Sequence, residues 1–192
     1  MEIIEKKYIE KFSLPLRIYK MAYVADAIGK SGEEFSIFVG LDEKLVAELT
    51  RYSEDLSDTE LQKNTPDKER FAKGAYEDWY KKIRTPFAFV HKKTDVLAAL
   101  VWLGPRPLDD KEGNWHTVGW RSYNPWRGKG VMKDFANFAI NFYLKHFPDV
   151  KLWITAKEEN TASLHLAENL GFKRIKYVRE KGFFEMIKDA TI

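Results

Sequence analysis

The feature that most constrains the fold is a glycine-rich turn between a predicted strand and a predicted helix. The strand covers residues 115–123, and the turn reads Asn124-Pro125-Trp126-Arg127-Gly128-Lys129-Gly130-Val131-Met132. Apolar residues then recur at helical spacing until Pro148 ends the helix. Glycine lets the main chain approach a ligand closely, and the first N–H groups of a helix lack partners within it. The segment therefore predicts a site for a phosphate-bearing ligand.

A second segment, residues 160–172, follows about thirty residues after the turn. Asn160 is a favoured N-cap, Gly171 is a favoured helix end, and Phe172 returns the chain to the core. We expect a short capped helix here, preceded by a short strand at 152–155.

The remaining chain alternates between strand and helix patterns. Residues 53–67 are polar and predict a loop or a short helix, while residues 66–83 carry apolar side chains every four positions and predict one helix. Further strands are expected at 35–39, 87–90, 96–103, 172–178 and 183–187, and a further helix at 42–51. This order predicts an α/β (α+β) fold in which a mixed sheet has helices on both faces.

We expect residues 1–33 to form an N-terminal extension packed on a single domain of residues 34–192. Within the extension, residues 3–9 predict a strand and the apolar-rich residues 16–28 predict a helix. A chain of 192 residues is long enough for one such domain with a substantial core.

Composition excludes several kinds of site. The chain has no cysteine, which excludes disulfides and cysteine nucleophiles. His91, His146 and His165 lack the spacing of metal ligands, so no metal is expected. The net charge of +3 argues against a nucleic-acid partner. Residues 1–7 do not resemble a signal peptide, and no stretch reaches the roughly 20 apolar residues of a membrane span. We expect a cytoplasmic protein without membrane contact.

The two segments together resemble those of the GNAT superfamily of N-acetyltransferases, over residues 35–188. The family's R/Q-x-x-G-x-G/A loop is matched at Arg127 and Gly130. Its N-x-x-A-x-x-L-Y-x-x-x-G-F segment is matched at Asn160, Leu166, Gly171 and Phe172, with Ser163 in place of alanine. The resemblance implies a mostly antiparallel central sheet of about six to seven strands.

The resemblance also implies acetyl-CoA as the cofactor. The backbone of Arg121, Ser122 and Tyr123 would pair with the pantetheine arm, and Asn160 would bond the same arm. The pyrophosphate would lie on the loop formed by Arg127, Gly128, Lys129, Gly130, Val131, Met132 and Lys133. Two residues depart from the family pattern: Met132 replaces a glycine or alanine, and Ala167 replaces the tyrosine that protonates the leaving thiolate.

In the family's reaction an amine attacks the thioester directly, so a proton acceptor is needed. His116 is the first candidate, although a buried structural histidine is the commoner role. Tyr123 and Tyr177, with Glu158 and Glu159, are further acid or base candidates. Among the tryptophans, Trp120 and Trp126 are better candidates for a pocket than Trp115, and core packing is the alternative for all three.

Three functions stay open on the sequence. An N-acetyltransferase would act on a small-molecule or peptide amine, as a monomer or homodimer. A non-catalytic acyl-CoA-binding or regulatory protein would keep the cleft without turnover, as the loss of tyrosine at Ala167 suggests. An RNA-associated module would use the basic turn, against which the small net charge speaks.

Overall fold

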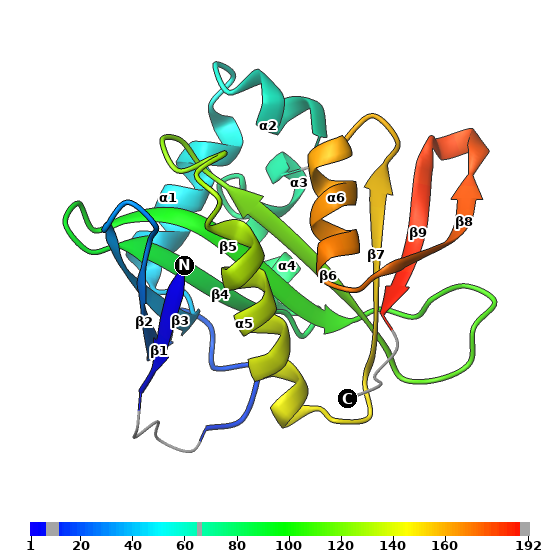
Figure 1. The fold of residues 1–192 in the computed structure, drawn as a ribbon, viewed down its shortest axis with the longest axis horizontal. Helices are drawn as coiled ribbons and strands as arrows, with labels where there is room; N and C mark the ends of the chain where they lie inside the picture. The colour runs from blue at the N-terminus through cyan, green and yellow to red at the C-terminus, as the bar shows by residue number, and fades with distance from the viewer. Residues whose placement is uncertain (7–11, 65–66, 189–192) are drawn as a thin grey trace.

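The computed structural model describes residues 1–6, 12–64 and 67–188, and these form one sheet flanked by helices (Figure 1). In the described part the sheet has nine strands in the order β1-β2-β3-β4-β5-β6-β7-β9-β8. All neighbours are antiparallel except β6 and β7. The predicted class is confirmed, with more strands than expected. The strands are β1 (Glu2–Glu5), β2 (Met21–Ile28), β3 (Glu34–Gly40), β4 (Thr85–His91), β5 (Val96–Pro105), β6 (Trp115–Ser122), β7 (Lys151–Lys157), β8 (Lys173–Val178) and β9 (Phe183–Lys188).

Helices cover both faces of the sheet, and each face has its own apolar core. One core joins α5 and α6 to the sheet through side chains such as Phe89, Phe135 and Leu164. The other joins α1, α3 and α4 to the opposite face through Leu49, Trp79 and Leu100 among others. The helices are α1 (Glu43–Glu54), α2 (Thr59–Asn64), α3 (Asp67–Phe71), α4 (Ala75–Tyr80), α5 (Met132–His146) and α6 (Thr161–Asn169), with a 3₁₀ turn at Arg179–Lys181.

The helix predicted at residues 16–28 is wrong, because residues 21–28 form strand β2. This strand turns through residues 29–33 into β3 and pairs with it from Ile28↔Glu34 to Met21↔Gly40. Backbone pairing with β3 decides the conformation, and it buries Val24, Ala25 and Ala27 completely. Strand β1 overlaps the strand predicted at 3–9 over residues 3–5, and residues 7–9 of that prediction lie outside the described part.

The helix predicted at 66–83 is also wrong as a continuous element, because it divides into α3 and α4. Gly74, at φ +82°, separates the two, and Ile83 lies beyond α4 at φ +57° with half of its surface exposed. A left-handed residue cannot continue an α-helix. The break lets Phe71 and Trp79 both pack edge-on against Trp102. It also brings the first turn of α3 beside β6, which matters for the site.

Candidate functional site

Strands β6 and β7 are paired at one end and separate toward the other, as Figure 1 shows beside α6. Their parallel register covers Trp115↔Lys151, His116↔Leu152 and Thr117↔Trp153. Beyond these pairs β6 continues to Ser122 and β7 to Lys157. Both strands therefore present an open edge to the gap between them.

The open edge of β6 carries backbone groups that point away from β5. The Tyr123 N–H donates to Ala98 O of β5 at 2.9 Å. Because successive residues of a strand alternate in direction, the N–H and C=O of Ser122 and Trp120 point into the gap. The Trp120 carbonyl accepts from Arg121 Nη1 at 2.6 Å, and the Ser122 carbonyl accepts from Arg127 at 3.3 Å. The N–H groups of Trp120 and Ser122 are the donors directed toward a ligand there.

The glycine-rich turn joins this edge to the start of α5. Gly128 and Gly130 have φ +76° and +73°, and nothing lies within 4 Å of where their Cβ atoms would be. Val131, the N-cap of α5, makes no side-chain cap bond. Among the described residues, the N–H groups of residues 130–133 find no protein acceptor, as expected at a helix start. The open space and unpaired donors fit an anion such as a pyrophosphate.

A cleft of about 790 Å³ connects the gap, the turn and α6. It is lined by Glu60, Leu61, Trp120, Arg121, Ser122, Asn124, Trp126, Arg127, Gly128, Gly130, Val131, Met132, Lys133, Asn160, Ala162, Ser163 and Leu166. Most of the predicted cofactor residues are among them, whereas Tyr123 and Lys129 are not. Trp120 and Trp126 reach the cleft as expected, while Trp115 packs with Trp153 and Leu108 instead.

Asn160 and Ser163 fix the α6 side of the cleft. The Asn160 side chain accepts from Ser163 N at 3.1 Å, which confirms it as the N-cap of α6. The Ser163 hydroxyl accepts from Trp120 Nε1 at 3.2 Å across the cleft. The serine that replaces the expected alanine therefore holds the indole of Trp120 in place.

The Arg127 side chain binds protein carboxylates on the α2 side of the cleft. Its Nη1 and Nη2 donate to the two oxygens of Asp58 at 2.8 and 2.6 Å, and Nη1 lies 3.4 Å from Glu60. Asp58 also caps α2 by accepting from Leu61 N. Arg127 lowers the pKa of Asp58, and Asp58 in turn raises that of Arg127. The guanidinium of Arg127 thus anchors α2, while its main chain belongs to the turn.

The three predicted catalytic side chains lie away from the cleft. His116 is 6% exposed, and its Nδ1 is 2.6 Å from Tyr143 Oη beneath α5. Burial, with a smaller effect of Arg84, lowers the pKa of His116. Tyr123 is fully buried and stacks on Tyr52 at 4.3 Å, and burial raises its pKa. Neither placement supports an acid–base role.

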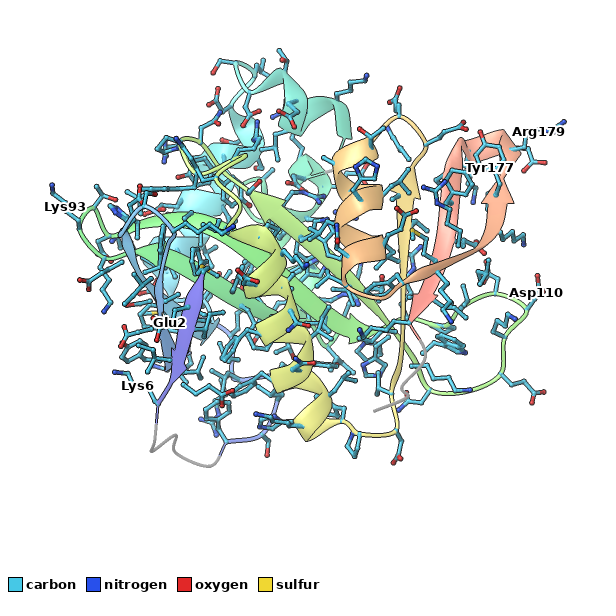
Figure 2. The ribbon with its side chains drawn as sticks, in the orientation of Figure 1. Glu2, Lys6, Lys93, Asp110, Tyr177 and Arg179 are labelled. Carbon is cyan, nitrogen blue, oxygen red and sulfur yellow. The ribbon has the colours of Figure 1, made fainter. Side chains whose placement is uncertain are left out.

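Tyr177 lies at the outer end of the β8–β9 hairpin, as Figure 2 shows. Its hydroxyl donates to Glu158 at 2.7 Å, which raises the pKa of Tyr177. Glu159 instead forms an ion pair with Lys63 of α2 at 3.6 Å. β9 stands between Tyr177 and β7, so this tyrosine also receives no support as an acid or base.

A family model described as an acetyltransferase (GNAT) domain matches residues 42–173. The chain belongs to the GNAT acetyltransferase family. It is therefore a GNAT-type acyltransferase, and the family's cofactor is acetyl-CoA. A search of curated proteins found no match.

Solved GNAT structures share the fold at low sequence identity. The GNAT domain of S. lividans PAT is 12% identical, with TM-score 0.64, over 85% of this chain and 95% of that one. Spermidine N-acetyltransferase from Vibrio cholerae, in complex with CoA and spermine, is 15% identical with TM-score 0.61, over 79% and 94% of the chains. Mycobacterium smegmatis RimJ, in complex with CoA-disulfide, is 12% identical with TM-score 0.61, over 79% and 81%.

On the sheet face opposite α5 and α6, this GNAT chain has a polar cluster that sequence reasoning missed. Asp67 of α3 is 4% exposed and accepts from Arg121 of β6 through both oxygens, at 2.8 to 3.1 Å. Arg70 is 3.6 Å from the same carboxylate. Asp67 and Arg121 are 54 residues apart in sequence, and no local signal links them.

Two further observations concern the described part of the GNAT chain. It has no group of three or more His, Cys, Asp or Glu side chains arranged to hold a metal ion. None of its described helices is both long and apolar enough to cross a membrane.

Proposed function

We propose that this GNAT enzyme acetylates a primary amine by direct attack on acetyl-CoA. The observation that carries the proposal is the cleft, in which the open edge of β6 and the unpaired N–H groups of residues 130–133 face one space. The open edge of β6 can align an extended arm by backbone hydrogen bonds, and the N–H groups of residues 130–133 can hold a pyrophosphate. Acetyl-CoA has both parts.

Several residues would hold the cofactor. The turn from Gly128 to Lys133 would receive the pyrophosphate, with Lys133 adding positive charge. The Trp120 and Ser122 N–H groups would bond the arm or the thioester oxygen. Asn160 lines the cleft with its side-chain nitrogen available, because its oxygen is used by Ser163 N. Arg127 would act indirectly, by holding α2 over the cleft.

The chemistry that acetyl-CoA supplies is an activated acyl group. A C–N bond forms as the C–S bond breaks, the amine gives up a proton, and the released thiolate takes one up. An N–H of β6 would stabilise the developing oxyanion. Ala167 is fully buried in the α6 core, so that position supplies no proton donor. We propose that solvent protonates the thiolate, which is a tolerable leaving group.

Calorimetric titration of acetyl-CoA tests the binding half of the proposal. Gly130→Ala should weaken binding about tenfold, because alanine strains the φ +73° backbone and displaces the N–H groups. Gly182→Ala is the matched control, since Gly182 has φ +62°, an equally open Cβ position and a place directly after the distant 3₁₀ turn. Wild-type protein that is folded yet binds no acetyl-CoA would refute the proposal.

The second candidate is an acyl-CoA-binding protein without turnover, which the alanine at position 167 favours. Release of free thiol over a panel of amines separates the two functions. Thiol release that depends on the added amine supports the transferase, whereas tight binding with no release above background supports the binding protein.

A further inference from the structure

The polar cluster on the α3 side of β6 holds more positive charge than its carboxylate can neutralise. We call Asp67, Arg70, Trp102 and Arg121 the arginine cluster. We propose that the arginine cluster binds a carboxylate of the acceptor, so that the amine substrate is an acidic molecule. This proposal rests on the proposed acetyltransferase function and specifies its acceptor.

Asp67 is already committed to Arg121. The Arg121 Nε and Nη2 donate to both oxygens of Asp67, and Nη1 donates to the Trp120 carbonyl. This side chain is 14% exposed and serves to brace α3 against β6. Arg121 is therefore a structural member of the cluster.

Arg70 is the member with donors to spare. Its nearest carboxylate oxygen, Asp67 Oδ1, is 3.6 Å away, which is an ion pair beyond hydrogen-bond distance. Its side chain is 29% exposed, against 4% for Asp67, so a ligand can reach it. A planar guanidinium matches a carboxylate through two parallel hydrogen bonds.

The surroundings of Arg70 favour an added negative charge. Arg70 and Arg121 lie over the same ring, that of Trp102, at 5.5 and 5.0 Å from its centroid. Burial and the neighbouring Arg121 lower the pKa of Arg70 to about 10, so it stays charged at neutral pH. Two guanidinium groups thus share one carboxylate in a partly desolvated place, and a bound anion would relieve the imbalance.

The arginine cluster lies next to the proposed reaction site. Gly119 allows the Trp102 ring to cover β6, since a Cβ there would lie 2.2 Å from the ring. Gly119 and Arg121 flank Trp120, whose N–H faces the gap, and two residues of a strand span only about 7 Å. An acceptor on this face can therefore place its amine at the gap and its carboxylate at Arg70.

Other charged side chains also lie on this face. Arg106, exposed at the end of β5, stacks on Trp153 of β7 at 4.9 Å. Glu185 of β9 pairs with Thr155 of β7, on the far side of the gap from α3. Lys176 of β8 lies directly opposite Glu185, so the excess charge on this face is the positive charge of the arginines.

A steady-state comparison of matched amines tests the proposal. An amino acid, its uncharged amide and spermidine would be compared by kcat/KM for thiol release. We expect at least a tenfold preference for the carboxylate form, lost in Arg70→Gln and partly kept in Arg70→Lys. Arg179→Gln is the control, because Arg179 lies at the outer end of the β8–β9 hairpin (Figure 2).

The possible outcomes distinguish failure of the carboxylate site from failure of the proposed acetyltransferase activity. Equal or greater activity toward the amide or spermidine, in wild-type protein, would overturn the carboxylate site and leave the acetyltransferase intact. Absence of thiol release with every amine would refute the acetyltransferase itself. Acetyl-CoA titration of Arg70→Gln checks that the variant is folded. If the variant does not fold, the comparison of the three amines in wild-type protein still tests the carboxylate site.

Discussion

His116 shows how the surroundings of one residue decide its role. It lies in the paired part of β6 and β7, where its ring contacts Tyr143 and Phe147 under α5. Burial disfavours its charged form and lowers its pKa below the usual value of 6.5. The imidazole is thus held neutral as part of the core.

This burial predicts a pH-dependent stability. The unfolded state binds the His116 proton more tightly than the folded state, so stability is lost as pH falls below about 6.5, by at most about 1.4 kcal/mol per pH unit. His116→Gln should reduce the difference in unfolding free energy between pH 7.5 and 5.0, measured with urea. His165→Gln, at an exposed position of α6, should not.

The same variant tests His116 as a base. Because the ring lies outside the cleft, the pH–rate profile of acetyl transfer should be unchanged in His116→Gln. A lost acidic limb in that profile would contradict the structural role and restore His116 as a catalytic candidate.

Ser163 is a second residue whose effect should be local. Ser163→Ala removes the acceptor for Trp120 Nε1, so the indole becomes free to turn within the cleft. Loss of one hydrogen bond costs about 1 kcal/mol, and we expect acetyl-CoA affinity to fall about three- to tenfold by calorimetry.

The control for Ser163→Ala is Ser53→Ala. Ser53 is buried in α1 and donates to Thr50 O at 2.8 Å, away from the cleft. Ser53→Ala also removes one side-chain hydrogen bond. An equal fall in acetyl-CoA affinity in both variants would therefore show that Ser163 does not position Trp120.

At the scale of elements, α2 is held against the cleft from two sides. Arg127 binds Asp58 at its start, while Lys157 of β7 donates to Lys63 O near its end at 3.0 Å. Leu61 of α2 lines the cleft. The helix has only six residues, so these ties rather than its own hydrogen bonds keep it in place.

Asp58→Asn should loosen α2 without removing its cap. Asparagine is an equally good N-cap but cannot form the charged pair with Arg127. We expect faster hydrogen–deuterium exchange across residues 59–64 and a loss of about 1–2 kcal/mol in stability. Glu60→Gln is the control, because its carboxylate is exposed and 3.4 Å from Arg127. Unchanged exchange in Asp58→Asn would show that the pair does not hold α2.

Elements with local signals could be predicted from the sequence, and those fixed by distant partners could not. The cap at Asn160 marked the start of α6 correctly, and the glycine turn marked the start of α5. Strand β2 was mistaken for a helix because its partner β3 defines it. The same holds for the candidate site. The glycine-rich turn has a local sequence signal and could be predicted, while the arginine cluster depends on a contact between α3 and β6 and could not.

At the scale of the whole molecule, the cleft lies where the sheet parts and helices of both layers meet. A ligand bound there joins α2, β6, α5 and α6, so it stabilises the folded state as a unit. Acetyl-CoA at 100 times its Kd should raise the free energy of unfolding by about 2.7 kcal/mol. For a chain of this size we expect Tm to rise by about 5–10 °C in a thermal melt. Pantetheine lacks the pyrophosphate and should give a smaller shift, and an equal shift would argue against the turn as its site.

The limited pairing of β6 with β7 also has a kinetic consequence. Strands β4, β5 and β6 follow one another through the loops of residues 92–95 and 106–114 as an antiparallel meander, whereas β7 reaches β6 only after α5 has crossed the sheet. Contacts between distant parts of a chain generally form late in folding. A folding intermediate in which β7 has not yet paired with β6 would lack the gap between these strands. It would therefore have no affinity for the cofactor. Recovery of acetyl-CoA binding should then lag behind recovery of tryptophan fluorescence during refolding.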